Sequence, residues 1–190
     1  ITKAMQAVKA KENEKVNSYE IFVNKTKTHI INSKGVDVTM SNFDCQIEVV
    51  INTSKDGHEI ELIKDFKFAN KDANQITKDV EEMFVSGNAR LQAVPTKQNA
   101  HANVLLTGDD LPQFYSYFVS HVNASNKFMG IAKGKIDEKM TGDEADNLTI
   151  ITKPILEGST KNNPYDNDGN LVKEKVLFEN GICKSYWGSV

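Results

Sequence analysis

The 190-residue sequence predicts an α+β fold, with an antiparallel sheet and packed helices followed by a mainly β C-terminal part. Three observations favour this class. Apolar and polar side chains alternate through residues 19–66, and turn residues interrupt the alternation at short intervals. Apolar side chains recur at helical spacing through residues 74–91. Near the C-terminus, Asn180-Gly181 separates two apolar runs, which is a strong hairpin signal.

The first elements are expected to be a helix over residues 1–16 and then an antiparallel meander. The helix has a weak apolar stripe that includes Met5, Val8 and Val16. Asp56-Gly57 is a hairpin turn between two alternating runs. The meander's strands are predicted at residues 19–25, 28–33, 36–40, 45–52 and 58–66, and the helix that follows them at residues 74–91.

A polar segment with a proline, residues 93–100, is the predicted domain boundary. Residues 1–94 are expected to form a portion of an N-terminal domain, and residues 95–190 the start of a β-rich C-terminal domain. The elements expected in this second part are a strand at 102–106, a helix at 111–124 capped by residues 107–110, an irregular stretch at 126–147 and a strand at 148–152.

Composition excludes several classes of protein. The 23 basic and 26 acidic residues give a net charge of −3 and form no basic block, which argues against direct nucleic-acid binding. No apolar run approaches the roughly 20 residues that span a bilayer, so no membrane partner is expected. Cys45 and Cys183 form no C-x-x-C motif, and a reducing, cytoplasmic compartment is expected. The chain starts without Met or a signal peptide, and we expect it to be a fragment.

The C-terminal third resembles one family. It reads Pro154-Ile155-Leu156-Glu157-Gly158, then Pro164-Tyr165-Asp166-Asn167-Asp168-Gly169, and then Lys175-Val176-Leu177-Phe178-Glu179-Asn180-Gly181. This run is similar to that of the TldD/PmbA proteins, and Asn32-Ser33-Lys34-Gly35-Val36 resembles a strand pair of the same family. The resemblance implies that the chain covers roughly the middle of a family member. It also implies proteolysis of peptides or unfolded proteins, in a family known as modulators of DNA gyrase that includes metalloproteases and partners without the metal.

The family's peptidases carry His-Glu-x-x-x-His on a helix, where two imidazoles hold Zn²⁺ and the carboxylate activates its water. The equivalent helix here is 111–124, and it matches only at His121. Val122 stands at the Glu position and Asn126 at the second His, while Cys183 does not match the family's Cys ligand. The resemblance therefore implies the PmbA/TldE-like branch, with no catalytic, cofactor-binding or metal residues in this chain and His121 as the one candidate ligand.

The same resemblance implies that zinc, if any, belongs to a partner subunit. The expected partners are a TldD-like subunit, or a second copy in a dimer, and a peptide substrate. Two alternatives stay open. One is an active zinc metallopeptidase with an unusual ligand set that includes His121, and the other is a non-enzymatic interaction module.

Other motifs have structural interpretations. Asp166-Asn167-Asp168-Gly169 looks like the start of a calcium loop, but the ligand position that needs Glu falls on Leu177, which favours a turn held by Asx side chains. The acidic residues between 137 and 146 are expected to lie in a solvated loop. The aromatic and aliphatic side chains of residues 176–178 and of Tyr186-Trp187 are expected to form core or a subunit interface.

Overall fold

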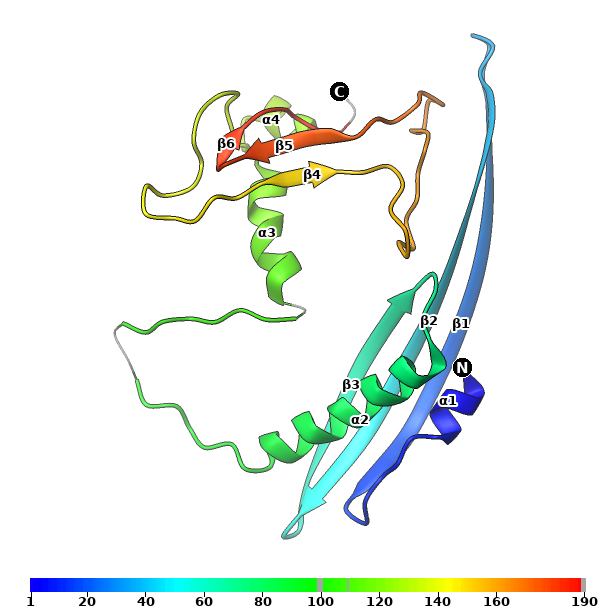
Figure 1. Cartoon of the computed structure of the whole chain (residues 1–190), viewed down its shortest axis with the longest axis vertical. Helices are drawn as coiled ribbons and strands as arrows, with labels where there is room; N and C mark the ends of the chain where they lie inside the picture. The colour runs from blue at the N-terminus through cyan, green and yellow to red at the C-terminus, as the bar shows by residue number, and fades with distance from the viewer. Residues whose placement is uncertain (99–100, 109, 189–190) are drawn as a thin grey trace. The chain divides into compact units, whose positions relative to one another are not determined.

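The computed structural model describes residues 1–98, 101–108 and 110–188 (Figure 1). The chain forms two compact units. The first contains Ile1–Gln98 and Ile155–Asn170, and the second contains Asn99–Pro154 and Leu171–Val190. Both units combine helices with an antiparallel sheet, so the predicted α+β class is confirmed. Among the described residues, no helix is both long and apolar enough to cross a bilayer.

The first unit is an antiparallel sheet with strand order β1-β2-β3. Its elements are α1 (Thr2–Gln6), β1 (Glu14–Ile31), β2 (Asp37–Lys55), β3 (His58–Phe68) and α2 (Ala73–Arg90). Ile47 on β2 lies opposite Ile21 on β1 and Phe66 on β3. Residues 24–31 and 37–44 pair beyond the end of β3, so β1 and β2 continue as a two-stranded arm.

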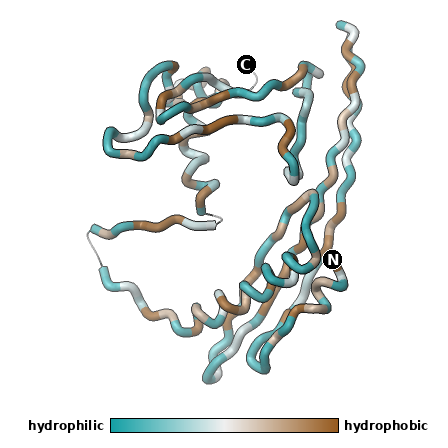
Figure 2. The backbone as a smooth tube through the Cα atoms, viewed as in Figure 1, coloured by the Kyte–Doolittle hydropathy of each residue, from teal (hydrophilic) through white to brown (hydrophobic). Residues whose placement is uncertain are grey.

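The core of the first unit lies between α2 and one face of this sheet. Alternate residues of β2 are buried, from Cys45 to Thr53, because successive side chains of a strand point to opposite faces. Figure 2 shows apolar residues recurring along α2, and four of them belong to the core against the sheet. Burying each such aliphatic or aromatic side chain stabilises the fold by about 1.5–3 kcal/mol. The helix contributes Ile76, Val80, Met83 and Phe84, and α1 adds Ala4 and Met5.

Residues 155–170 dock on the β1–β2 hairpin. The backbone N–H of Asn162 donates to the Asn42 Oδ1 atom at 3.2 Å, and the Asn42 Nδ2 atom donates to Asn163 Oδ1 at 3.2 Å. At the hairpin tip, Asn32 Nδ2 donates to the carbonyl of Asp168 at 3.3 Å. Gly169 lies so close to the hairpin that a Cβ there would be 2.2 Å from the Val36 Cγ1 atom. These contacts attach a segment distant in sequence to the first unit.

The second unit has a smaller sheet with strand order β4-β5-β6. Its elements are α3 (Asp110–Ser120), α4 (Ala124–Phe128), β4 (Ile150–Thr152), β5 (Lys175–Glu179) and β6 (Ile182–Cys183). Asn180 and Gly181 both have positive φ, 51° and 79°, which confirms the predicted tight turn. Four residues form the buried core: Val122, Leu177, Phe178 and Cys183.

Several predicted boundaries were wrong. The first helix ends at Gln6 instead of residue 16, since Val16 belongs to β1 and packs against the core from the sheet. The four strands predicted between residues 19 and 52 are two long strands, because residues 25–28 and 41–44 continue the pairing without a turn. Residues 102–106 form no strand, and Leu105 is exposed.

The units also divide the chain differently from the single boundary expected after residue 94. The compact units separate between Gln98 and Asn99, and residues 155–170 group with the first unit through the contacts described above. Part of the predicted boundary segment, residues 99–100, lies outside the described residues, as does residue 109 of the predicted cap at 107–110.

Candidate functional site

The helix that should carry the metal motif ends before His121. α3 stops at Ser120, and α4 begins at Ala124, so the prediction of one helix over 111–124 was wrong. The backbone of Trp187 explains the break: its N–H donates to the Val122 carbonyl at 3.0 Å, and its carbonyl accepts from the Ala124 N–H at 2.8 Å. The Val122 carbonyl and the Ala124 N–H are therefore paired with a distant segment, and they cannot continue the i to i−4 hydrogen bonds of α3.

Asn123 starts the next helix. Its Oδ1 atom accepts from the Asn126 N–H at 3.1 Å, which is the usual N-cap bond. In turn, the Asn126 Nδ2 atom donates to the Ser120 carbonyl at 2.9 Å and satisfies a terminal carbonyl of α3. The residue at the second-histidine position is thus a capping residue that holds two short helices together.

The His121 imidazole is held by neighbouring protein groups. Its ring lies edge-to-face against Tyr117, with centroids 4.4 Å apart, and its Nδ1 atom accepts from the Lys133 N–H at 3.4 Å. The His121 carbonyl accepts from Gly134 N–H at 3.0 Å. Within the part of the chain that the structure describes, no three His, Cys, Asp or Glu side chains gather closely enough to hold a metal ion.

Val122 stands at the glutamate position and is completely buried. It forms the second core together with Leu177, Phe178 and Cys183. A carboxylate at this position would be desolvated without a partner, at a cost of several kcal/mol. The three positions that correspond to His-Glu-x-x-x-His therefore provide one partly exposed imidazole, one core aliphatic group and one helix cap.

Gly134, which the sequence did not single out, packs directly against this turn. A Cβ on Gly134 would lie 2.6 Å from the His121 carbonyl oxygen and 2.7 Å from the Val122 Cγ1 atom. Its carbonyl accepts from the Tyr186 hydroxyl at 3.1 Å and from Lys127 Nζ at 3.4 Å. No sequence signal distinguishes this glycine from the other glycines of an irregular loop, because its role depends on a close approach between distant segments.

The predicted Asx turn at residues 166–169 is present. Asp166 Oδ1 accepts from the N–H groups of Asp168 and Asn170 at 2.9 and 2.8 Å, and Asp166 Oδ2 accepts from Asn170 Nδ2 at 3.0 Å. These bonds, the one from the Asn170 side chain foremost, lower the pKa of the Asp166 carboxyl. Leu177, at the position where a calcium loop needs its glutamate, is buried.

The acidic loop residues form exposed ion pairs with lysines. Asp137 lies 3.3 Å from Lys184 Nζ, and Glu138 lies 3.3 Å from Lys135 Nζ. The side chain of Asp143 is fully exposed beside Lys139. Such exposed pairs contribute about 0–1 kcal/mol to stability.

Cys45 is buried on β2 of the first unit, and Cys183 is buried in the core of the second unit. Burial raises the pKa of both the Cys45 and the Cys183 thiols, so neither is a ready thiolate nucleophile at neutral pH. The aromatic residues considered as core or interface pack into the second core: Phe178 is fully buried, and Tyr186 and Trp187 are partly buried around it. The Trp187 indole N–H donates to the Val119 carbonyl at 2.7 Å.

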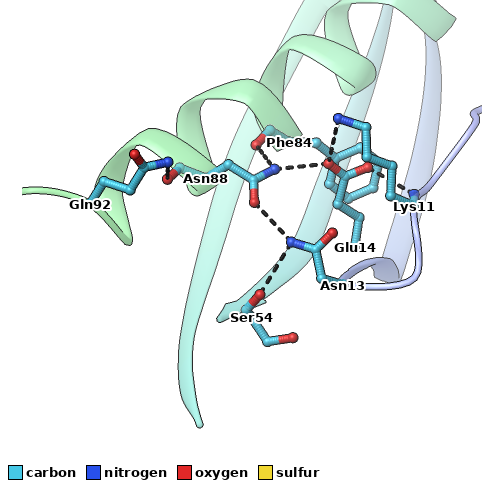
Figure 3. A network of polar contacts seen from close by, with 7 residues as sticks. All are labelled: Lys11, Asn13, Glu14, Ser54, Phe84, Asn88 and Gln92. Carbon is cyan, nitrogen blue, oxygen red and sulfur yellow. Dashed lines mark hydrogen bonds and ion pairs between the residues drawn. The ribbon is translucent and has the colours of Figure 1, made fainter. Parts of the chain in front are cut away.

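A polar network in the first unit, shown in Figure 3, was also missed. The Glu14 side chain is 4% exposed, and its carboxylate accepts from the Lys11 N–H at 2.9 Å and from Asn88 Nδ2 at 2.8 Å. Asn13 Nδ2 donates to Asn88 Oδ1 at 3.0 Å and to the Ser54 carbonyl at 3.2 Å. These polar groups hydrogen-bond one another and attach residues 11–14 to α2, so the network has a structural role.

Comparison with known proteins agrees with the fold. Residues 99–189 match the sequence model described as the PmbA/TldA metallopeptidase C-terminal domain. The crystal structure of TldE from Thermococcus kodakarensis aligns with a TM-score of 0.70 at 19% identity, over 98% of this chain and 41% of that one. A proposed modulator of a DNA gyrase from Thermotoga maritima MSB8 aligns with a TM-score of 0.62 at 18% identity, over 88% of this chain and 38% of that one.

No curated protein matches this sequence significantly. The chain spans about two fifths of the solved relatives, 41% of one and 38% of the other, and shares their fold. The matched domain and the shared fold agree with the resemblance of the C-terminal motifs. Residues 99–189 belong to the PmbA/TldA metallopeptidase C-terminal domain family, and the chain shares the fold of the TldE structure.

Proposed function

We propose that this chain comes from the PmbA/TldE-like branch and acts as the metal-free partner subunit of a metalloprotease. The observation that carries the proposal is the structural role of the residues at the three motif positions. His121 lies beyond the end of α3, Val122 is fully buried, and Asn126 caps a helix terminus. A catalytic zinc needs three protein ligands and a water, and one imidazole cannot assemble that set.

A TldD-like subunit would supply the zinc and the general base in this proposal. The complex would process peptides or unfolded proteins in the cytoplasm, and this chain would contribute scaffold and substrate-contacting surface. The fold shared with a protein named TldE over 98% of this chain supports the assignment to this branch. Pairing with a second copy is the alternative mode of assembly.

Reconstitution tests the proposal. The whole protein is purified alone and with the TldD-like chain of the same organism, and cleavage of an unstructured peptide is measured. We expect no cleavage by this protein alone and cleavage by the pair. His121→Ala should leave the activity of the pair unchanged, like the matched change of the exposed His101→Ala.

Two results would contradict the proposal, each in favour of one alternative. Cleavage by this protein alone, abolished by His121→Ala but not by His101→Ala, would identify an active metallopeptidase with an unusual ligand set. If the protein neither associates with a TldD-like chain nor affects its activity, a non-enzymatic interaction module would explain it better.

A further inference from the structure

The chain has three places where aspartate or asparagine precedes glycine: Asp56-Gly57, Asp168-Gly169 and Asn180-Gly181. At such a pair the glycine nitrogen can attack the side-chain carbonyl carbon of the preceding residue and close a succinimide ring, because glycine has no Cβ to obstruct the approach. Aspartate loses water in this step, and asparagine loses ammonia. When water then opens the ring at the main-chain carbonyl carbon, the peptide continues through the side chain as isoaspartate.

Two of these pairs form hairpin turns with nearly equal φ angles. The values are 51° and 80° for Asp56 and Gly57, and 51° and 79° for Asn180 and Gly181. Both pairs connect adjacent antiparallel strands, β2 with β3 and β5 with β6. These φ angles differ too little to make the two pairs react differently, so a difference in reactivity must come from the groups around each turn.

The Asn180 turn is held by other segments of the second unit. The Gly181 N–H donates to the Leu148 carbonyl at 2.8 Å, and the Gly181 carbonyl accepts from the Met140 N–H at 2.9 Å. A Cβ on Gly181 would lie 2.2 Å from the Thr141 Oγ1 atom, so a second segment packs directly against the turn. The nitrogen that would attack is therefore engaged, and ring closure requires this hairpin to open first.

The pair Asp168-Gly169 is engaged as well. The Gly169 N–H donates to the Asp166 carbonyl at 3.1 Å. A Cβ on Gly169 would lie 2.2 Å from the Val36 Cγ1 atom, because this turn packs on the β1–β2 hairpin. Reaction at Asp168 therefore also requires local opening.

The Asp56 turn has no comparable contacts. Residues 55–59 are exposed, and within the part of the chain that the structure describes the Gly57 N–H makes no hydrogen bond. A Cβ on Gly57 would meet no atom within 4 Å. No contact among the described residues therefore keeps the Gly57 nitrogen away from the Asp56 side chain.

We propose that Asp56 is a site of isoaspartate formation in the folded protein, whereas Asn180 is protected by the contacts of its hairpin. The Gly57 nitrogen bonds to Asp56 Cγ and loses its proton, and a carboxyl oxygen leaves as water. A second water adds to the main-chain carbonyl carbon of Asp56 and breaks its bond to the Gly57 nitrogen. The sum is an isomerisation without change of mass. Residue chemistry alone favours the opposite order, since Asn-Gly pairs react faster than Asp-Gly pairs.

Isoaspartate adds one methylene group to the backbone of this two-residue turn. Turn type and loop length fix the register of a hairpin, so the longer turn opposes the pairing of Lys55 with His58. The neighbouring Ser54 carbonyl accepts from Asn13 Nδ2 in the network of Figure 3. We therefore expect modified molecules to unfold at a lower urea concentration than unmodified ones.

The variant Asp56→Asn gives a matched comparison inside one chain. It keeps the turn, because Asn-Gly is favoured in such hairpins, and it creates a second Asn-Gly pair. The folded variant is held at neutral pH, and deamidation at each position is followed by peptide mapping with mass spectrometry. We expect position 56 to react at least about tenfold faster than Asn180, which corresponds to an opening free energy of about 1.4 kcal/mol or more at the protected hairpin. In urea the two rates should become similar.

The unchanged protein tests the aspartate itself. Enzymatic methylation of isoaspartyl carboxyl groups, followed by peptide mapping, should mark Asp56 before Asp168 or Asn180. Asp56→Glu should abolish the signal at this position, because glutamate would have to close a larger ring. Circular dichroism before and after incubation shows that the protein stays folded.

Three results would overturn the inference. They are equal rates at the two positions of folded Asp56→Asn, faster reaction at Asn180 than at position 56, and an unchanged protein in which Asp56 reacts only in urea. None of these results bears on zinc content or on proteolysis with a TldD-like chain. The inference goes beyond the proposed function and can fail or hold without it.

Discussion

Gly169 is the residue on which the docking of residues 155–170 depends most directly. Its φ of 82° is unfavourable for side chains, and a Cβ would meet Val36 Cγ1 at 2.2 Å. We expect Gly169→Ala to lower the free energy of unfolding of the first unit by about 2–4 kcal/mol, the sum of the backbone strain and the contact with Val36, measured by urea denaturation. Gly158→Ala is the control, because Gly158 has a φ of 76° but no atom within 4 Å of its added Cβ.

That control separates backbone strain from steric contact. Gly158→Ala should cost only the strain of a positive φ, about 1 kcal/mol. Equal losses from the two variants would mean that residues 155–170 do not pack on the hairpin as described.

Asp166 makes the neighbouring turn sensitive to acid. Bonds from Asn170 lower the pKa of the folded-state carboxyl below its unfolded value. The stabilisation of the turn is therefore complete above the unfolded-state pKa and is lost as the pH falls through the folded-state pKa. Hydrogen exchange of the Asn170 backbone amide should show this loss in acid.

Two substitutions check the assignment. Asp166→Asn should remove the acid transition of the Asn170 amide, because it removes the titrating acceptor. Asp168→Asn should leave the transition in place, since Asp168 contributes main-chain groups to these bonds. A transition that persists in Asp166→Asn would assign the effect to another group.

At the scale of elements, α2 and β2 are joined by a close contact between Gly87 and Thr53. A Cβ on Gly87 would lie 2.7 Å from Thr53 Oγ1, a buried atom for which the described residues offer no hydrogen-bond partner. We expect Gly87→Ala to destabilise the protein by about 1–3 kcal/mol through this clash, although alanine favours the helix by about 1 kcal/mol.

A double-mutant cycle measures the contact. Thr53→Ala removes both clashing atoms, so Gly87→Ala should become stabilising in that background, by up to about 1 kcal/mol. The two changes should then couple by more than 1 kcal/mol in denaturation experiments. Effects that simply add would show that α2 does not approach β2 at Gly87.

Elements whose signals are local could be predicted from the sequence. The apolar spacing of residues 74–91 predicted α2, and Asp56-Gly57 and Asn180-Gly181 predicted the hairpin turns. Elements whose bounds depend on residues distant in the sequence could not be predicted. Trp187 ends α3 by pairing with Val122 and Ala124, and nothing within residues 111–124 indicates that pairing. The strand expected at 102–106 is likewise apolar in sequence but finds no partner among the described residues.

The same division holds for the candidate site. The residue types at positions 122 and 126 are enough to show that Val122 and Asn126 cannot replace a glutamate and a histidine as catalytic groups. The tasks they do perform, as core and helix cap, depend on the fold. Gly134 and the Glu14–Asn88 network were not predictable, because each depends on a contact between segments far apart in the chain.

For the whole molecule, the metal-free role depends on His121, which belongs to no group of three potential metal ligands among the residues that the structure describes. The chain covers 41% of the TldE structure that it resembles, and the full protein is the proper object of the test. Its zinc content is to be measured by elemental analysis after purification in zinc-containing buffer and dialysis, without any partner chain. We expect far less than one zinc per chain, with no change on His121→Ala; one tightly held zinc per chain that His121→Ala removes would contradict the account.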